Sequence, residues 1–215
     1  MQLTCTHSNV VFLFNYNVFD NFNLTEVEEK LRETLSGESE IALTTIPNQI
    51  KVVFAQTKNI QVASQQNSLI VSDQNLNETN TAGNDFLRTA HEVVKLFTQF
   101  GLKTFGYNFQ FSIVPDNFSE LQDSLKDKFY KDEVLNSSDQ EAIFTLPNVG
   151  YLKNGAIYMI AFTAALDDEN RPVKVNVSSS VTHEPEIATL GTLAAFKAKY
   201  NAAYREVYEY IEGVL

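Results

Sequence analysis

Few residues of this chain could bind a metal ion. The three histidines, His7, His91 and His183, fall in an apparent strand, on the polar face of a predicted helix and at a strand end. A zinc site needs closely spaced ligands such as HxxxH or CxxC pairs, and the sequence has neither. The nearest approach is His183 with Glu184 and Glu186, which we interpret as an exposed strand end. We therefore expect no metal and no cofactor.

The residues that could act as nucleophiles are also poorly placed for catalysis. Cys5 lies within a run of strand-forming residues, which is typical of a small core residue. No G-x-S-x-G elbow is present, so we interpret the serines of 178–180 as a strand edge. Glycine-rich nucleotide cradles are absent too, and most Asp and Glu residues fall on predicted helix faces and turns. The sequence favours a non-enzymatic protein.

One polar surface that is poor in charge remains as a candidate binding site. In the stretch 107–114, aromatic and aliphatic residues alternate with polar ones, which predicts a strand with one covered and one solvated face. The stretch 173–178 alternates in the same way. Gln61 and Ser64 are expected to share the solvated face. This face is either an ordinary solvated sheet or a docking surface. If it is a docking surface, the predicted binding residues are Asn108, Gln110, Ser112, Lys174, Asn176 and Ser178.

Composition limits the class of partner. The chain has 215 residues, of which 44% are hydrophobic, enough to bury one substantial core. Its formal net charge of −11 disfavours binding to a phosphate backbone, so no nucleic acid is expected. We find no signal peptide and no apolar run of about 20 residues, so we expect no membrane partner. A single cysteine fits a reducing compartment, and we expect a cytoplasmic protein.

The elements that must position the polar face follow from hydrophobic periodicity. Residues 85–100 place apolar side chains at helical spacing, and the stretch 107–114 follows after two glycines. Residues 3–16 predict an interior strand covered on both faces for part of its length, and 41–73 a meander of three or four strands. Short helices are expected after capping boxes at Thr25/Glu28 and Ser119/Gln122. A second meander covers 141–181, and a helix covers about 192–212.

Landmarks of the first half recur in the second half in the same order. Phe12 and Phe14 match Phe109 and Phe111 at an offset of 97. The two capping boxes share an offset of 94, and Thr45-x-Pro47-Asn48 matches Thr145-x-Pro147-Asn148 at 100. Loop insertions between equivalent elements produce such drifting offsets. We therefore predict an internal duplication, with residues 1–103 as the first repeat and 104–215 as the second, within a single globular domain of residues 1–215.

The predicted fold class is α+β. Each repeat is read as β-α-β-β-β-α, with an additional strand allowed in the first, and two units side by side make one long, twisted, mostly antiparallel sheet with four helices on one face. This element order resembles that of TATA-binding-protein-like and helix-grip folds, in which helices cover the convex side of a curved sheet. The resemblance concerns element order alone and implies no function.

Two functional hypotheses follow. The first is a protein-binding or assembly module that uses the polar sheet face, with self-association as a homodimer included because Tyr200, Tyr204 and Tyr208 could form a dimer seam instead of core. The second is a small-molecule-binding protein or enzyme with a pocket between sheet and helices. The aromatic residues expected near this pocket are Phe97, Phe109, Phe111, Tyr158 and Tyr204.

A third hypothesis is an acidic decoy for a nucleic-acid-binding protein.

Overall fold

The architecture is one nine-stranded sheet with helices packed against it. A computed structural model of the chain describes residues 2–74, 85–129, 148–169, 172–184 and 190–215. Every pair of neighbouring strands is antiparallel, in the order β2-β3-β4-β5-β1-β6-β9-β8-β7. The predicted α+β class and the single antiparallel sheet are confirmed. The strands are β1 (Gln2–Phe14), β2 (Ile41–Ile46), β3 (Ile50–Ala55), β4 (Ile60–Gln65), β5 (Ser68–Asp73), β6 (Leu102–Val114), β7 (Asn148–Lys153), β8 (Ala156–Leu166) and β9 (Pro172–His183).

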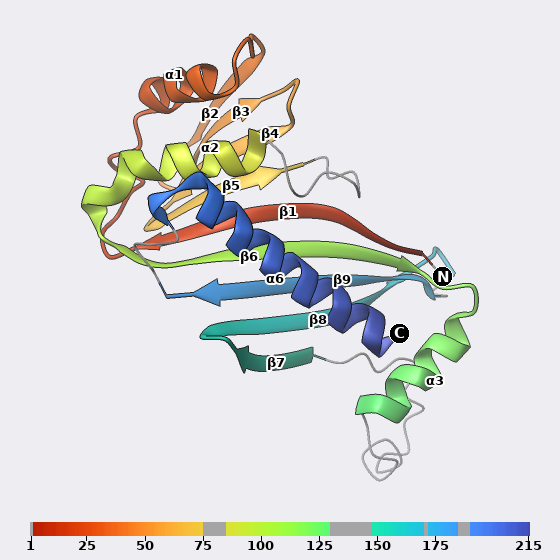
Figure 1. Cartoon of the computed structure of the whole chain (residues 1–215). Helices are drawn as coiled ribbons and strands as arrows, with labels where there is room; N and C mark the ends of the chain where they lie inside the picture. Colours follow the sequence, from red (N-terminus) through yellow and green to blue (C-terminus); the bar gives the residue numbers. More distant parts are fainter. Residues whose placement is uncertain (1, 75–84, 130–147, 170–171, 185–189) are drawn as a thin grey trace.

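Four α-helices and a 3₁₀ helix lie within the described residues. Helix α1 contacts β3, α2 contacts β5, α6 contacts β6, and α3 contacts both β9 and α6. Helix α6 runs obliquely across the central strands (Figure 1). The helices are α1 (Leu24–Thr34), α2 (Asp85–Val94), η1 (Lys95–Phe100), α3 (Phe118–Phe129) and α6 (Leu193–Val214).

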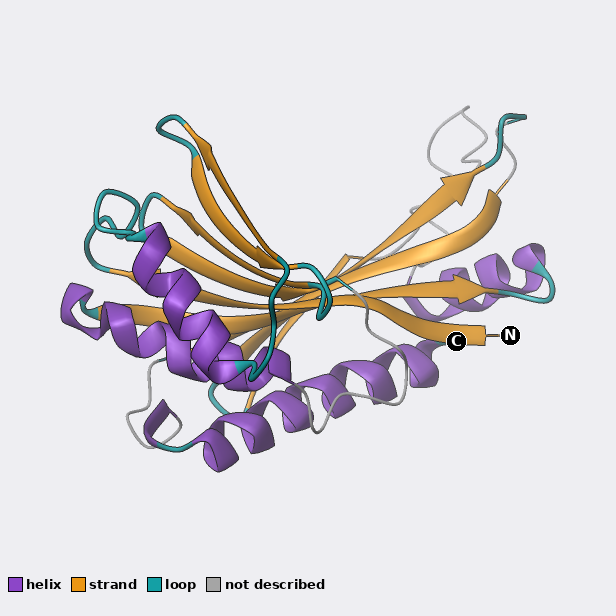
Figure 2. Ribbon diagram, turned by 90° about the horizontal axis from the view of Figure 1, so that it is seen from above, coloured by secondary structure: helices purple, strands orange, loops and turns teal. Residues whose placement is uncertain are grey.

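The sheet has one covered face and one open face. Along β6 and β9, buried apolar side chains alternate with half-buried or exposed polar ones, as the sequence predicts. Figure 2 shows the helices on one side of the sheet, while the two ends of the sheet curve away from them. The open face is therefore concave. On the open face of β1, Asn9 and Val11 are half-buried and Leu13 is exposed, so the predicted burial on both faces for part of its length is wrong.

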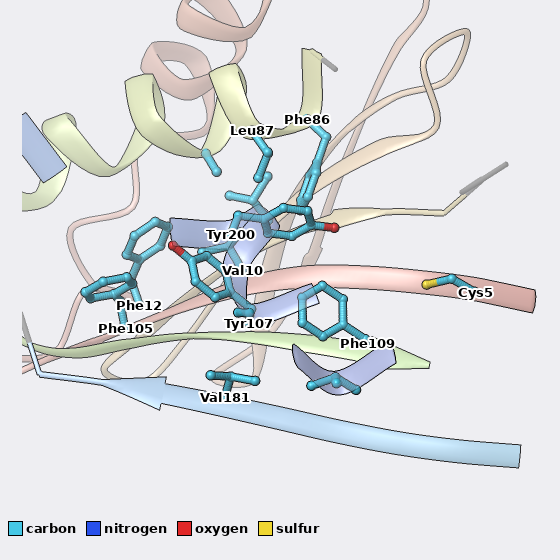
Figure 3. Packing of buried hydrophobic residues seen from close by; sticks show 14 of the residues in the cluster. Cys5, Val10, Phe12, Phe86, Leu87, Phe105, Tyr107, Phe109, Val181 and Tyr200 are labelled. Atoms are coloured by element: carbon cyan, nitrogen blue, oxygen red, sulfur yellow. The ribbon is translucent and has the colours of Figure 1, made fainter. Parts of the chain in front are cut away.

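Aromatic side chains fill the centre of the covered face. Tyr200 of α6 lies edge-on to Tyr107 and Phe109 of β6, with ring centroids 5.3 Å apart in both pairs. Figure 3 shows these rings packed above the central strands. The hydroxyl of Tyr200 donates to Ser8 Oγ on β1 at 2.8 Å. Helix α6 therefore joins the two central strands through both packing and a buried hydrogen bond.

Both short helices begin earlier than predicted. The side-chain oxygen of Asn23 accepts hydrogen bonds from the backbone N–H groups of Thr25 and Glu26, so Asn23 is the N-cap of α1. In α3, Asn117 accepts in the same way from Ser119 and Glu120. The predicted capping boxes at Thr25/Glu28 and Ser119/Gln122 are wrong, because an asparagine two residues earlier provides the cap. The two asparagines are 94 residues apart, like the predicted boxes.

The two halves of the chain have similar element orders. The first half, from β1 to η1, reads β-α-β-β-β-β-α, and the second half, from β6 to α6, reads β-α-β-β-β-α. Their central strands pair so that Val10 opposes Tyr107 and Asn9 opposes Asn108. Val10 and Tyr107 are 97 residues apart, the offset that relates Phe12 to Phe109, whereas Asn9 and Asn108 are 99 residues apart. Strand β6 begins at Leu102, so the predicted repeat boundary after residue 103 falls inside it. The predicted match at Thr145 and Pro147 lies outside the described residues.

Candidate functional site: the open face of the sheet

The six predicted binding residues all lie on the open face. Asn108, Gln110 and Ser112 belong to β6, and their neighbours on β9 are Ser180, Ser178 and Asn176 respectively. Lys174 continues the same face of β9 beside Ala165 of β8. Two adjacent strands therefore place these side chains in one continuous polar surface.

Ser64 does not lie on the open face. It opposes Leu69, which is fully buried, and Ser64 itself has no exposed surface. Gln61 opposes Ser72 on the open side. Residues 61 and 64 are separated by an odd number of positions, and side chains of a strand alternate between faces, so they cannot share one face. The prediction for Ser64 is wrong.

A hollow of about 550 Å³ interrupts the open face above β9. Two rows of paired residues form it, one running from Asn9 through Asn108 and Ser180 to Met159, and the other from Gln110 through Ser178 and Ala161 to Asn148. Ser180 in the first row and Ser178 and Ala161 in the second have short side chains, while carboxamides and a methionine flank them. The short side chains make the floor of the hollow, and the longer ones make its walls.

Only part of the hydrogen-bonding capacity of the hollow is used within the protein. Asn108 Nδ2 donates to Asn9 Oδ1 at 2.7 Å, across the pair of central strands. Asn9 Nδ2 lies 3.5 Å from Nε2 of His7. Burial lowers the pKa of His7, which favours the neutral imidazole. The hollow therefore presents uncharged donors and acceptors.

The open face carries almost no charge. Among the described residues of β8 and β9 and in the stretch 104–114 of β6, Lys174 is the one Lys, Arg, Asp or Glu on this face. The ionic residues of the other strands, such as Lys51 and Lys153, project on the covered side or beyond it: Lys51 Nζ donates to the backbone oxygen of Phe22, and Lys153 pairs with Glu206 of α6. The chain as a whole has a formal charge of −11. The described part of the concave surface is thus nearly uncharged, although the protein as a whole is acidic.

Exposed aliphatic residues adjoin the hollow. Leu152, Ile157 and Met159 of the β7–β8 hairpin are 73%, 52% and 52% exposed. Leu152 opposes Ile157, and Met159 follows on the same face of β8. Together we call these three residues the aliphatic edge. Clustered exposed aliphatic groups beside a polar hollow are typical of binding surfaces.

Some residues of this site were missed by the sequence analysis. Asn9 reaches the hollow because β1 pairs with β6, and Asn148 reaches it because β7 pairs with β8. The alternation of the stretch 3–16 contains the signal for Asn9, but the strand order is needed to bring it beside Asn108. Met159 lies within the apolar stretch 156–166, so residue type alone gives no signal for it.

Two of the three histidines are placed differently from the predictions. His91 is 3% exposed, and its Nε2 lies 3.0 Å from the backbone oxygen of Leu190. His183 is also buried, with its ring stacked on Phe105. The expected polar-face position of His91 and the expected exposed end at His183 are wrong, because segments distant in sequence cover both rings. In the part of the chain that is described, no three His, Cys, Asp or Glu residues form a metal-binding group.

Cys5 is a core residue in this structure. The side chain is buried, and its Sγ donates weakly to the backbone oxygen of His7. Burial raises the pKa of the thiol from 9.0 to about 12. A thiol with this pKa holds its proton at neutral pH, so Cys5 is a poor nucleophile.

The aromatic residues expected around a pocket do not converge. Phe109, Phe111 and Tyr204 contact one another, but Phe97 packs against Phe14 and Phe22 in the first half. Tyr158 stacks on Tyr151 at 4.9 Å. A hollow of about 280 Å³ lies between β1 and α6, lined by Leu3, Cys5, Tyr204 and Tyr208. It involves Tyr204 alone from the predicted set.

Comparisons with protein families and with curated proteins give no match for this chain, so the geometry of the site is the basis for its interpretation. In the described ranges, no helix is both long and apolar enough to cross a membrane.

Proposed function

We propose that this chain is a non-enzymatic protein-binding or assembly module that uses the open face of its sheet. The observation that supports it is a concave, nearly uncharged surface that combines a polar hollow with the exposed aliphatic edge. Protein interfaces are typically depleted in charge at their centres and contain both apolar and hydrogen-bonding groups. The homodimer expected from the sequence is one form of such an assembly.

Lysine substitutions on the open face test this proposal. The triple variant Asn108→Lys, Gln110→Lys and Asn176→Lys introduces three charges that a partner would have to desolvate. We expect it to lose the partners that the unmodified chain captures by affinity purification and mass spectrometry. Self-association, measured by analytical ultracentrifugation, should also be lost if the partner is a second copy.

A matched control carries the same charge elsewhere. Thr25→Lys, Gln56→Lys and Ser119→Lys add three lysines at exposed positions on α1, on the turn after β3 and on α3. This control should keep its partners, with an unchanged melting temperature. Identical capture by the open-face variant and the unmodified chain would contradict the proposal.

A small-molecule site between sheet and helices is the second candidate. The hollow beside Cys5 and Tyr204 supports it, but its volume of about 280 Å³ is at the lower limit of ligand pockets, which are usually about 300–1,000 Å³. A thermal-shift screen with metabolites tests this candidate, because a ligand that binds only the native state raises its melting temperature. Stabilisation that is abolished by Tyr204→Trp would favour this candidate over the first.

The internal duplication is proposed on related grounds. The two N-capping asparagines, Asn23 and Asn117, are 94 residues apart. Val10 and Tyr107, which oppose each other on the two central strands, are 97 residues apart. Both halves also place their first strand at the centre of the sheet and their last strand next to it. A relative whose two halves align with each other along their whole length would test this proposal.

A further inference from the structure

The hollow of the open face has a shape that could hold an extended chain. Each of its two rows of side chains crosses four adjacent strands, β1, β6, β9 and β8 in one row and β6, β9, β8 and β7 in the other. Neighbouring strands are about 4.8 Å apart, so the rows extend across the strands over more than 10 Å. Ser178, Ser180 and Ala161 leave room above the backbone that longer side chains would fill. A segment of a few extended residues fits such a trough.

The unused hydrogen-bonding groups define the chemistry of the occupant. The side chains of Gln110, Asn148, Ser178 and Ser180 make no hydrogen bond within the described residues. Carboxamides and hydroxyls each offer a donor and an acceptor. An occupant must therefore carry donors and acceptors in similar numbers, as peptide groups and primary amides do.

Charged ligands do not match this site. The residues that line the hollow include no Lys, Arg, Asp or Glu. A phosphate, carboxylate or ammonium group held there would lose water without gaining a counter-charge. The occupant at this position is therefore neutral.

None of the described residues that line the hollow offers an accessible aromatic ring, which favours a peptide over a sugar or a nucleic-acid base as the occupant. Phe109 contributes to the lining, but its side chain has no exposed surface and packs on Tyr200 and Tyr204 on the covered face. Bases bind single-strand readers chiefly by stacking on such rings. The surface next to the hollow is instead the aliphatic edge of Leu152, Ile157 and Met159. Aliphatic side chains beside amides are a property of polypeptides.

Resting on the proposed function, we propose that the hollow binds a neutral, extended polypeptide segment of a partner protein. The peptide groups and any Asn, Gln, Ser or Thr side chains of this segment hydrogen bond to Asn108, Gln110 and Asn148. An aliphatic side chain of the segment packs on the aliphatic edge. The small residues Ser178 and Ser180 determine specificity, because they leave the space that the segment occupies.

Selection from a library of random twelve-residue peptides displayed on phage, with the full chain immobilised, tests this inference. We expect enriched peptides to share an uncharged core that combines an aliphatic residue with Asn, Gln, Ser or Thr. Their affinity, measured by fluorescence anisotropy, should fall at least tenfold in Ser180→Ile, which fills the floor of the hollow. The control Thr44→Ile, on exposed β2 in the first half, should bind as the unmodified chain does.

The contrary outcomes are distinct. Enrichment of charged motifs, or failure to enrich any motif, would overturn the inference. Equal binding by Ser180→Ile would also overturn it, provided that this variant keeps the circular dichroism spectrum and melting temperature of the unmodified chain. The chain could instead bind a glycan on an array or form a dimer. If Ser180→Ile abolishes that binding or that dimer, the occupant of the hollow is the glycan or the second copy and not a peptide. If the triple-lysine variant still loses its partners, the open face remains the binding surface and only the peptide is wrong. If that variant keeps its partners, the proposed function itself fails.

Discussion

The open faces of the two halves differ although their strands are arranged alike. In the first half, Val11 of β1 pairs with Ile70 of β5, which pairs with Ala63 of β4. At the corresponding place in the second half, Asn108 pairs with Ser180, which pairs with Met159. Val11 and Asn108 are 97 residues apart, as are Phe12 and Phe109. An aliphatic row in one half therefore corresponds to a polar row with a short central residue in the other.

This difference shows which features the fold requires and which it leaves free. Both halves keep buried aromatic rings on the covered face, since Phe12 and Phe109 have no exposed surface. Packing of the helices depends on that face, so its residue types are restricted. The open face is not restricted in this way, and the hollow occurs over β6, β9 and β8. For this reason we propose that the polar row serves binding.

The largest expected effect concerns the shared part of the two halves. Phe12→Ala and Phe109→Ala each remove a fully buried ring, and each should lower the free energy of unfolding by about 3–5 kcal/mol. Similar losses would mean that both halves contribute equally to one cooperative core. Urea denaturation followed by circular dichroism measures both variants.

The neighbouring residue Leu13 provides the control for these two variants. Its side chain projects on the open face and is exposed, so Leu13→Ala should change the free energy of unfolding by less than about 1 kcal/mol. A large loss for Phe109→Ala with a small loss for Phe12→Ala would break the equivalence of the halves. Such a result would mean that the second half contributes most of the free energy of unfolding.

The next effect is a loss of stability at alkaline pH. The buried tyrosines Tyr107 and Tyr200 belong to β6 and α6 of the second half, and burial raises the pKa of both hydroxyls above 10.0. Burial also raises the pKa of Cys5 from 9.0 to about 12. The unfolded chain ionises at the ordinary pKa values while the folded chain stays neutral. Stability is therefore full below pH 9 and falls above it, by about 1.4 kcal/mol per pH unit for each ionising group.

Thermal unfolding at pH 8 to 11 measures this loss, with Cys5→Ala as the matched variant. Between pH 9 and 10 the unfolded thiol ionises before the tyrosines, so Cys5→Ala should remove much of the decline in that interval. Above pH 10 the decline should persist through the tyrosines of the second half. A melting temperature constant from pH 8 to 11 would contradict the assigned pKa directions.

A smaller effect is expected when the two open faces are exchanged residue by residue. Ile70 is half-buried, so Ile70→Ser should lower the free energy of unfolding by about 1–2 kcal/mol through lost apolar burial. The reverse change, Ser180→Ile, adds an aliphatic group on an open surface and should alter stability by less than about 0.5 kcal/mol. Chemical denaturation measures both. A large loss for Ser180→Ile would mean that Ser180 supports the fold and not a ligand.

The sequence predicts the covered face better than the site. Alternation between faces is a local property, so Asn108, Gln110 and Asn176 could be assigned to one surface from residue types alone. Asn9 and Asn148 join them through strand pairing, which local patterns do not specify. His91 was misplaced for the same reason, because the backbone at Leu190 that covers it is 99 residues away. The helix starts failed because Asn23 and Thr25 both satisfy the capping preference, and backbone geometry selects between them.

The last predicted effect distinguishes two hydroxyl groups at the junction of the halves. The Tyr200 hydroxyl donates to Ser8 Oγ, so Tyr200→Phe should lower the free energy of unfolding by about 1 kcal/mol. The Tyr107 hydroxyl is buried and makes no hydrogen bond within the described residues. Tyr107→Phe removes a buried polar group without breaking a bond, so it should leave stability unchanged or raise it by up to about 1 kcal/mol. Urea denaturation of the two variants measures the contrast. Equal losses would mean that the Tyr107 hydroxyl has a partner, such as a buried water molecule, and that both tyrosines of the second half are fixed by hydrogen bonds.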